Sequence, residues 1–196
     1  MVHGGEGNDR VAAAVDASDD VYAGDAGSDV LDYSATTLGV NIYVGEGTAE
    51  GEEIGRDEIS GFEVVIGGRG NDSINSGRGS ISMTGGEGED TFEFETPDQD
   101  NRGSLVRTIT DFTVGDRLLV AFYEFRDNSG QGNAEDDSFY NRYLADEDNH
   151  RWIRFRFENH DDRDFTVMSV AEGTPDAEYD IQLFGRLLFD VQDHHH

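Results

Sequence analysis

Single large apolar residues recur at short intervals along the first hundred residues, each between stretches rich in glycine and acidic residues. In the most regular part they stand nine residues apart, and each lies at the centre of a three-residue segment that follows a six-residue loop. One apolar position between turn signals predicts a short β-strand, and a fixed period predicts that such strands stack as repeats around a shared core. The residues in the apolar position are Val11, Tyr22, Leu31, Ile74, Met83 and Phe92.

The loops between these segments carry the pattern Gly-Gly-x-Gly-x-Asp in three complete copies, at 4–9, 67–72 and 85–90. A looser copy occupies 24–29, and a degenerate copy at 76–81 ends in isoleucine instead of aspartate. Glycine permits positive-φ turns that bring backbone carbonyls close to a bound ion, and the aspartate supplies a charged oxygen. The loops are therefore candidate sites for a cation that prefers oxygen ligands.

The spacing of the aspartates supports this interpretation. In the calcium-binding repeat family that this pattern resembles, two nine-residue repeats make one full turn of the coil, which implies that alternate loops stack one strand spacing apart. Asp72 and Asp90 are eighteen residues apart, and we expect both carboxylates to face one ion. Ile81 cannot do this, so the opposite edge should lack a matching site at that point. The alternative, glycine-rich turns without metal, would leave aspartates stacked about 5 Å apart to repel one another.

Over residues 4–32 and 67–94 the sequence resembles the RTX, or hemolysin-type, family of calcium-binding repeats. The resemblance implies an all-β protein, a parallel β-roll whose cofactor is calcium. In that family one loop contributes positions two, four and six to an ion, and the next stacked loop contributes positions one, three and six. Near the N-terminus the aspartates are twenty residues apart, so we expect a bulge at Ala13-Ala14. Carried onto this sequence, the ligands are Gly68, Gly70, Asp72, Gly85, Glu87 and Asp90 in one site, and Gly5, Gly7, Asp9, Gly24, Ala26 and Asp29 in a second, less regular site.

The repeats divide the chain into a roll and a cap. Residues 1–103 are expected to form the roll, with a wider coil at 33–66, and residues 104–193 to form a capping and secretion-signal region. Residues 194–196 are interpreted as the remnant of a purification tag. Acidic residues in the wider coil are interpreted as a solvated turn, and they are Glu46, Glu50, Glu52, Glu53, Asp57 and Glu58.

After residue 94 the sequence changes character. Residues 108–118 resemble the segment that closes the roll in serralysin-type proteases and in the R-modules of alginate epimerases. In this chain we expect Asp111 and Asp116 either to ligate a last ion or to cap a turn. Alternating apolar and polar positions at 152–158, 165–170 and 181–184 predict strands of an antiparallel cap. Repeat arrays need a cap because the end of the array otherwise exposes its core and an unpaired strand.

One predicted strand of the cap carries a second candidate site. Alternation places Ile153 and Phe155 on a core face, and Trp152, Arg154 and Arg156 on the opposite face. An aromatic ring beside arginines would suit an anionic polysaccharide, as the likeness to epimerase modules implies. The alternative is local pairing of these arginines with neighbouring acidic residues, which are Glu158, Asp161 and Asp162.

The composition narrows the range of partners. The chain has 14 Lys+Arg, all of them arginine, and 43 Asp+Glu, for a net charge of −29. Nucleic acid is an unsuitable partner for so acidic a chain, whereas cations would relieve its self-repulsion. There is no cysteine, which excludes thiolate metal sites, and no apolar run has the ~20 residues of a membrane span. The sequence start also lacks the pattern of a cleaved signal peptide.

No sequence signature of an enzyme accompanies the repeats. Motifs of metalloproteases, P-loop proteins and serine hydrolases are missing, and the EF-hand-like segment 127–138 lacks the final glutamate. We therefore expect a non-catalytic, extracellular calcium-binding module that folds on binding calcium. The family resemblance adds export by type I secretion machinery. The alternative is an accessory module that binds an anionic polysaccharide.

Overall fold

The computed structural model describes residues 1–96, 105–120, 123–127, 143–146, 151–172, 178–185, 187 and 189–193. This part of the chain is all β and contains no helix, so no helix within it is suited to crossing a membrane. The strands are β1 (Val2–Glu6), β2 (Arg10–Ala12), β3 (Val21–Ala26), β4 (Val30–Asp32), β5 (Val40–Tyr43), β6 (Thr48–Gly51), β7 (Gly55–Ser60), β8 (Val64–Ile66), β9 (Ser73–Asn75), β10 (Ile81–Thr84), β11 (Thr91–Phe94), β12 (Arg107–Ile109), β13 (Arg117–Val120), β14 (Tyr123–Asp127), β15 (Tyr143–Asp146), β16 (Arg151–His160), β17 (Arg163–Glu172), β18 (Glu178–Phe184) and β19 (Phe189–Asp193).

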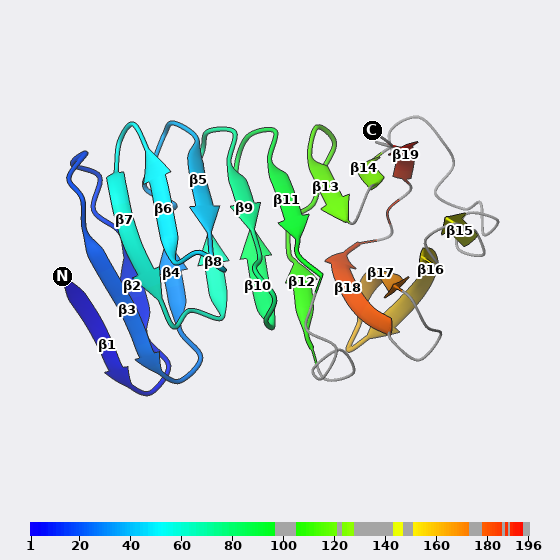
Figure 1. Cartoon of the computed structure of the whole chain (residues 1–196), viewed down its shortest axis with the longest axis horizontal. Coiled ribbons are helices and arrows are strands. Elements are labelled where there is room, and N and C mark those ends of the chain that lie inside the picture. The colour runs from blue at the N-terminus through cyan, green and yellow to red at the C-terminus, as the bar shows by residue number, and fades with distance from the viewer. Residues whose placement is uncertain are drawn as a thin grey trace.

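The strands form two mixed sheets that lie along the length of the molecule, with the strands across its long axis (Figure 1). The ten-stranded sheet has the order β1-β3-β7-β6-β5-β9-β11-β13-β14-β19. The nine-stranded sheet has the order β15-β16-β17-β18-β12-β10-β8-β4-β2. Because successive strands alternate between the sheets over most of the array, strands two apart in sequence pair in parallel, as β9 does with β11 and β10 with β12.

The apolar position of each repeat lies in the core, as predicted. Ile74 pairs with Phe92, and Phe92 pairs with Leu118 in the next strand. In the other sheet Met83 pairs with Val65. Equivalent side chains therefore stack along both sheets and fill the space between them. All six residues predicted for this position are exposed by 5% or less.

The N-terminal repeats keep this stacking despite their longer spacing. β1 pairs with β3, and β2 with β4, at an offset of twenty residues. The predicted bulge does not begin at Ala13, which is buried in the core. The two additional residues are instead accommodated in the turn 14–20, where Ala17 has a φ of 58°. The loops at 4–9 and 24–29 consequently stay in register.

Residues 33–66 widen the array in a different manner from the predicted coil. Within the ten-stranded sheet β5, β6 and β7 are antiparallel neighbours, while β7 pairs in parallel with β3 and β5 with β9. The turns after β5 and β6 contain Gly47 and Gly55, whose φ values are 73° and 71°. Tight turns of this kind join antiparallel strands, whereas parallel strands need a crossover. Two hairpin connections therefore interrupt the parallel stacking.

The C-terminal region forms the predicted antiparallel strands. β16, β17 and β18 are antiparallel, and β18 pairs in parallel with β12, so the cap continues the nine-stranded sheet. β14 and β19 extend the other sheet beyond β13, and both pair antiparallel. Aromatic rings fill the space between them, with Phe125 5.6 Å from Phe155 and 5.9 Å from Phe189 between ring centroids. The end of the parallel array is thereby covered (Figure 1).

Candidate metal-binding site

The loops between the sheets stack along two edges of the molecule. At the first edge the chain passes from the ten-stranded to the nine-stranded sheet, through loops 4–9, 24–29, 61–63 and 76–80. At the second edge it passes back. Its loops include 67–72, 85–90 and 110–116. The structure thus brings together the two loop pairs that the sequence predicted as metal sites, one pair at each edge.

At the second edge three aspartates form a hydrogen-bonded ladder. The backbone N–H of Asp72 donates to Oδ1 of Asp90 at 2.8 Å, and the N–H of Asp90 donates to Oδ1 of Asp116 at 2.9 Å. The N–H of Val40 in turn donates to Oδ1 of Asp72 at 2.8 Å. All three carboxylates are buried. Each one fixes the backbone of the loop stacked beside it.

Burial makes this ladder electrostatically costly in the absence of a cation. It raises the pKa of Asp72 and of Asp116, and it raises the pKa of Asp90 to about 7, with further contributions from the charges of the other two. A carboxylate in such surroundings binds either a proton or a cation more readily than one in water. At neutral pH the second edge is therefore suited to a divalent ion.

The first edge has a corresponding ladder with two unsatisfied oxygens. The N–H of Asp9 donates to Oδ1 of Asp29 at 2.8 Å, and the N–H of Asp29 donates to Oε2 of Glu63 at 2.8 Å. Within the described residues, the buried Oδ2 atoms of Asp9 and Asp29 have no hydrogen-bond partner. Burying a carboxylate oxygen without a donor is unfavourable. These two atoms fit a bound cation.

Backbone conformation follows the predicted role of glycine in two of the three complete loops, whereas Gly68 and Gly70 of loop 67–72 do not have positive φ. Positions two and four of loops 4–9 and 85–90 adopt positive φ, a conformation that residues with a Cβ rarely adopt. The four glycines are Gly5 (102°), Gly7 (118°), Gly86 (107°) and Gly88 (135°). Gly67, at the first position of its loop, has no space for a Cβ, which would collide with Oδ2 of Asp72 and the carbonyl of Gly85. This pair of oxygens faces a space that only glycine leaves open.

The predicted carbonyl ligands also hold neighbouring loops together. The carbonyl of Gly68 accepts the N–H of Glu87 at 3.0 Å, and that of Ala26 accepts the N–H of Gly7 at 2.9 Å. The carbonyl of Gly70 lies against Gly88 in the next loop, and the carbonyl of Gly24 lies against Gly4. Each carbonyl retains a second lone pair. The described residues include no group of three or more His, Asp or Glu side chains able to hold a metal, so an ion here would depend on these carbonyls. Oxygen-only donors of this kind suit calcium.

Asp111 caps a turn in this structure. Its Oδ1 accepts the N–H of Gly85 at 2.9 Å, and its Oδ2 accepts the N–H of Gly86 at 2.8 Å. Asp116, rather than Asp111, therefore occupies the ladder position. The sequence carries a signal for this, because Asp116-Arg117-Leu118 repeats the aspartate and the apolar position that end the preceding loops.

Asp57 departs from the prediction of a solvated turn. It is 1% exposed, its Oδ1 accepts the N–H of Asp20 at 2.9 Å, and its Oδ2 accepts the hydroxyl of buried Tyr33 at 3.0 Å. Asp57 thus repeats the arrangement at Asp72 and Asp90, in which Oδ1 accepts the N–H of a stacked segment. Its Oδ2 differs in accepting a tyrosine hydroxyl. Sequence reasoning missed it because the hairpins of 33–66 conceal the spacing.

The carbonyls of the degenerate loop at 76–81 accept hydrogen bonds from an arginine that sequence reasoning did not identify. Arg107 is fully buried, and its guanidinium donates to the carbonyls of Gly77 at 3.2 Å, Gly79 at 3.2 Å and Glu95 at 2.6 Å. Gly77 and Gly79 occupy positions two and four of the degenerate loop. Ile81, in place of the aspartate, is buried in the core. A fixed side-chain charge thus occupies this junction.

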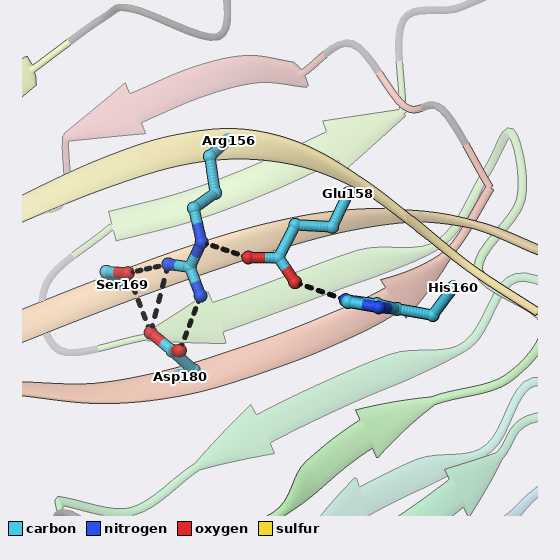
Figure 2. Close-up of polar contacts among 5 residues, drawn as sticks. All are labelled: Arg156, Glu158, His160, Ser169 and Asp180. Atoms are coloured by element: carbon cyan, nitrogen blue, oxygen red, sulfur yellow. Dashed lines mark hydrogen bonds and ion pairs between the residues drawn. The ribbon is translucent and has the colours of Figure 1, made fainter.

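Arg156, one of the residues predicted for polysaccharide binding, pairs with other residues of the cap. Arg156 donates to Asp180 at 2.6 Å, to Glu158 and to Ser169, and Glu158 also contacts His160 (Figure 2). The hydrogen bond to Asp180, followed by that to Glu158, raises the pKa of Arg156. Burial would raise the pKa of Asp180, but the bonds from Arg156 and Ser169 lower it.

The other two residues of the predicted polysaccharide site lie together. The guanidinium of exposed Arg154 is 6.0 Å from the centroid of the Trp152 ring. Asp161 and Asp162, which were considered as partners of the arginines, form the turn between β16 and β17. Of the acidic residues considered, Glu158 pairs with Arg156, and Asp180 is a partner that sequence reasoning did not consider.

Comparison of the sequence with models of known protein families and with curated proteins finds no match. Residues 128–138 of the EF-hand-like segment and residues 194–196 lie outside the described part of the chain.

Proposed function

We propose that this chain is a non-catalytic calcium-binding module of RTX type, in which the alternating strands form a parallel β-roll. The observation that supports this most directly is the buried Oδ2 of Asp9, which has no hydrogen-bond partner among the described residues and lies near the carbonyl of Gly24 in the next stacked loop. The stacked pair Asp72 and Asp90 supplies the second site. Both sites offer carboxylates and carbonyls, the ligands that calcium prefers.

In this proposal calcium supplies positive charge that the loops lack, and the residues around it hold the loops in register. Aspartate Oδ1 atoms accept an N–H of the neighbouring loop, while Oδ2 of Asp9 and the loop carbonyls face the ion. At the second edge Oδ2 of Asp72 also accepts the N–H of Gly68 at 2.5 Å. Since the unfolded chain has no preformed site, the free energy of binding contributes to folding. Extracellular sites of this class respond at ~10⁻⁴–10⁻³ M calcium. The chain would therefore stay expanded inside the cell and fold after export, which we assign to type I secretion machinery.

A calcium titration followed by circular dichroism and thermal unfolding tests the proposal. Calcium at 100 times Kd should stabilise the fold by about 2.7 kcal/mol for each independent site, and chelation should reverse the effect. The double variant Asp72→Asn/Asp90→Asn should lose the contribution of the second-edge site. Glu50→Gln/Glu52→Gln removes the same charge from two exposed side chains and should respond to calcium like the parent.

Two results would contradict the proposal. One is a melting temperature and sheet content that do not change after exhaustive chelation. The other is an equal calcium response in the aspartate variant and its glutamate control. Magnesium at matched ionic strength separates specific binding from general screening of the acidic chain.

A polysaccharide-binding role receives less support. Of the two arginines predicted for it, Arg156 is bound to Asp180, Glu158 and Ser169, which favours the local-pairing alternative. Calcium binding is therefore the function that the described residues support best.

A further inference from the structure

We propose a further divalent-cation site at the first edge, between loop 24–29 and the short turn 61–63, formed by Asp29, Glu63 and the carbonyl of Gly61. It rests on the proposed calcium function, and it joins Asp29 of the looser loop copy to the turn 61–63, which lacks the loop pattern. Calcium, or a trivalent lanthanide of similar size, is the class of ion that such oxygen donors would bind.

Three junctions between stacked loops share one arrangement. At each, a Cβ placed on the first glycine of a loop would meet Oδ2 of the aspartate that ends the same loop and a carbonyl of the next loop. At Gly4 these atoms are Oδ2 of Asp9 at 3.1 Å and the carbonyl of Gly24 at 2.6 Å. Two of these junctions are the calcium sites proposed above. The three glycines are Gly4, Gly24 and Gly67.

The third junction is the one at Gly24. A Cβ there would lie 2.8 Å from Oδ2 of Asp29 and would collide with the carbonyl of Gly61. Gly61 has a φ of 69° and therefore takes the place of a loop glycine, although its turn is too short to contain the repeat pattern. The two oxygens face the same space as their counterparts in the complete loops.

Glu63 occupies the aspartate position of this shortened turn. β4 pairs with β8 so that Val30 lies opposite Val64, which places Asp29 opposite Glu63. The N–H of Asp29 donates to Oε2 of Glu63 at 2.8 Å, as the N–H of Asp9 does to Oδ1 of Asp29. The other oxygen of the Glu63 carboxylate remains available as a ligand.

Asp29 supplies an independent reason for a cation at this point. Its side chain is 0% exposed, and its Oδ2 has no hydrogen-bond partner within the described residues. Asp9 uses its own Oδ2 at the neighbouring junction, so the unpartnered oxygen of Asp29 belongs with Gly61 and Glu63. A divalent ion would satisfy all three groups.

Ion stoichiometry tests the site. Equilibrium dialysis of the whole chain with calcium should show one ion fewer for Glu63→Gln than for the parent, because the amide keeps an acceptor for the N–H of Asp29 but loses the charge. Glu58→Gln, at an exposed position of β7, is the matched control and should keep the full number. Calcium at the Asp72 and Asp90 site should still bind the Glu63 variant.

Crystals of the parent soaked with terbium give a second measurement that does not depend on how the variant folds. An anomalous peak between Asp29 and Glu63 would support the site, and its absence beside a peak at Asp72 and Asp90 would overturn it. Unchanged stoichiometry in Glu63→Gln, with an ion lost in Asp72→Asn, would also overturn this site alone. A parent chain that binds no calcium would overturn the proposed function and this site together.

Discussion

Replacing Arg107 with methionine tests whether a fixed positive charge holds the degenerate loop closed. Methionine keeps most of the apolar stem but removes hydrogen bonds to three carbonyls, those of Gly77, Gly79 and Glu95. It also removes a cation above two aromatic rings. The guanidinium carbon lies 5.5 Å from the ring centroid of Phe94 and 5.2 Å from that of Tyr179.

The expected loss in the free energy of unfolding follows from the carbonyl groups that methionine would leave buried without a donor. Each unsatisfied buried carbonyl costs about 1–3 kcal/mol, and removing one partner of a buried charged contact costs about 3–5 kcal/mol as a whole. Burial lowers the pKa of Arg107, which reflects a desolvation cost that methionine avoids. We therefore expect Arg107→Met to lower the free energy of unfolding by about 3–4 kcal/mol.

Urea unfolding at saturating calcium and in chelator measures this loss. Because the guanidinium occupies the junction, the loss should be similar in the two conditions. Arg56→Met, at an exposed position of β7, should change stability by less than about 0.5 kcal/mol. The prediction is refuted if Arg107→Met lowers the free energy of unfolding by less than about 1 kcal/mol, or if calcium abolishes the difference from the parent. Either result would show that the guanidinium does not stabilise the degenerate loop.

Three further predictions concern other buried or paired charges. The raised pKa of Asp90, about 7 in the folded chain against an ordinary value of 3.8, means that the folded state binds protons more tightly. Metal-free protein should therefore lose stability as pH rises from about 4 to about 7, whereas calcium should reverse this trend and Asp90→Asn should flatten it in melting curves at fixed ionic strength. Tyr33→Phe removes the hydroxyl that donates to Asp57 and should lower the free energy of unfolding in urea by about 1–3 kcal/mol. Tyr43→Phe is the control and should change it little, so equal effects of the two variants would contradict the role of Tyr33. Arg156→Met should cost about 1 kcal/mol, and a double-mutant cycle with Asp180→Asn should show coupling, since additive effects would mean that the pair contributes nothing.

The repeat spacing was sufficient to predict the core and the stacked loops. One apolar residue every nine positions places Ile74 opposite Phe92, and the eighteen-residue interval places Asp72 beside Asp90. These predictions succeed because each strand repeats the same short-range constraints, so the register follows from counting.

Counting fails where partners come from segments without the repeat. Asp57 meets Tyr33 across hairpins, Glu63 ends a shortened turn, and Arg107 reaches back to a loop nearly thirty residues earlier. An isolated acidic or basic residue in such a segment looks like a surface residue in sequence. Only the pairing of β12 with β10 brings Arg107 to the loop before β10.

Junctions between stacked loops differ along this chain in whether a side chain satisfies their buried oxygens. Asp57 receives a tyrosine hydroxyl, and the carbonyls of Gly77 and Gly79 receive a guanidinium, so these junctions are complete in the polypeptide alone. Within the described part of the chain, Oδ2 of Asp9 and Oδ2 of Asp29 are buried without a donor. The side chains at each junction decide whether the polypeptide itself supplies the partner, and under the proposed function the remaining junctions would take an ion. A calcium-dependent fold would then be controlled by a few junctions at its edges, while the side-chain-satisfied junctions keep neighbouring strands in register.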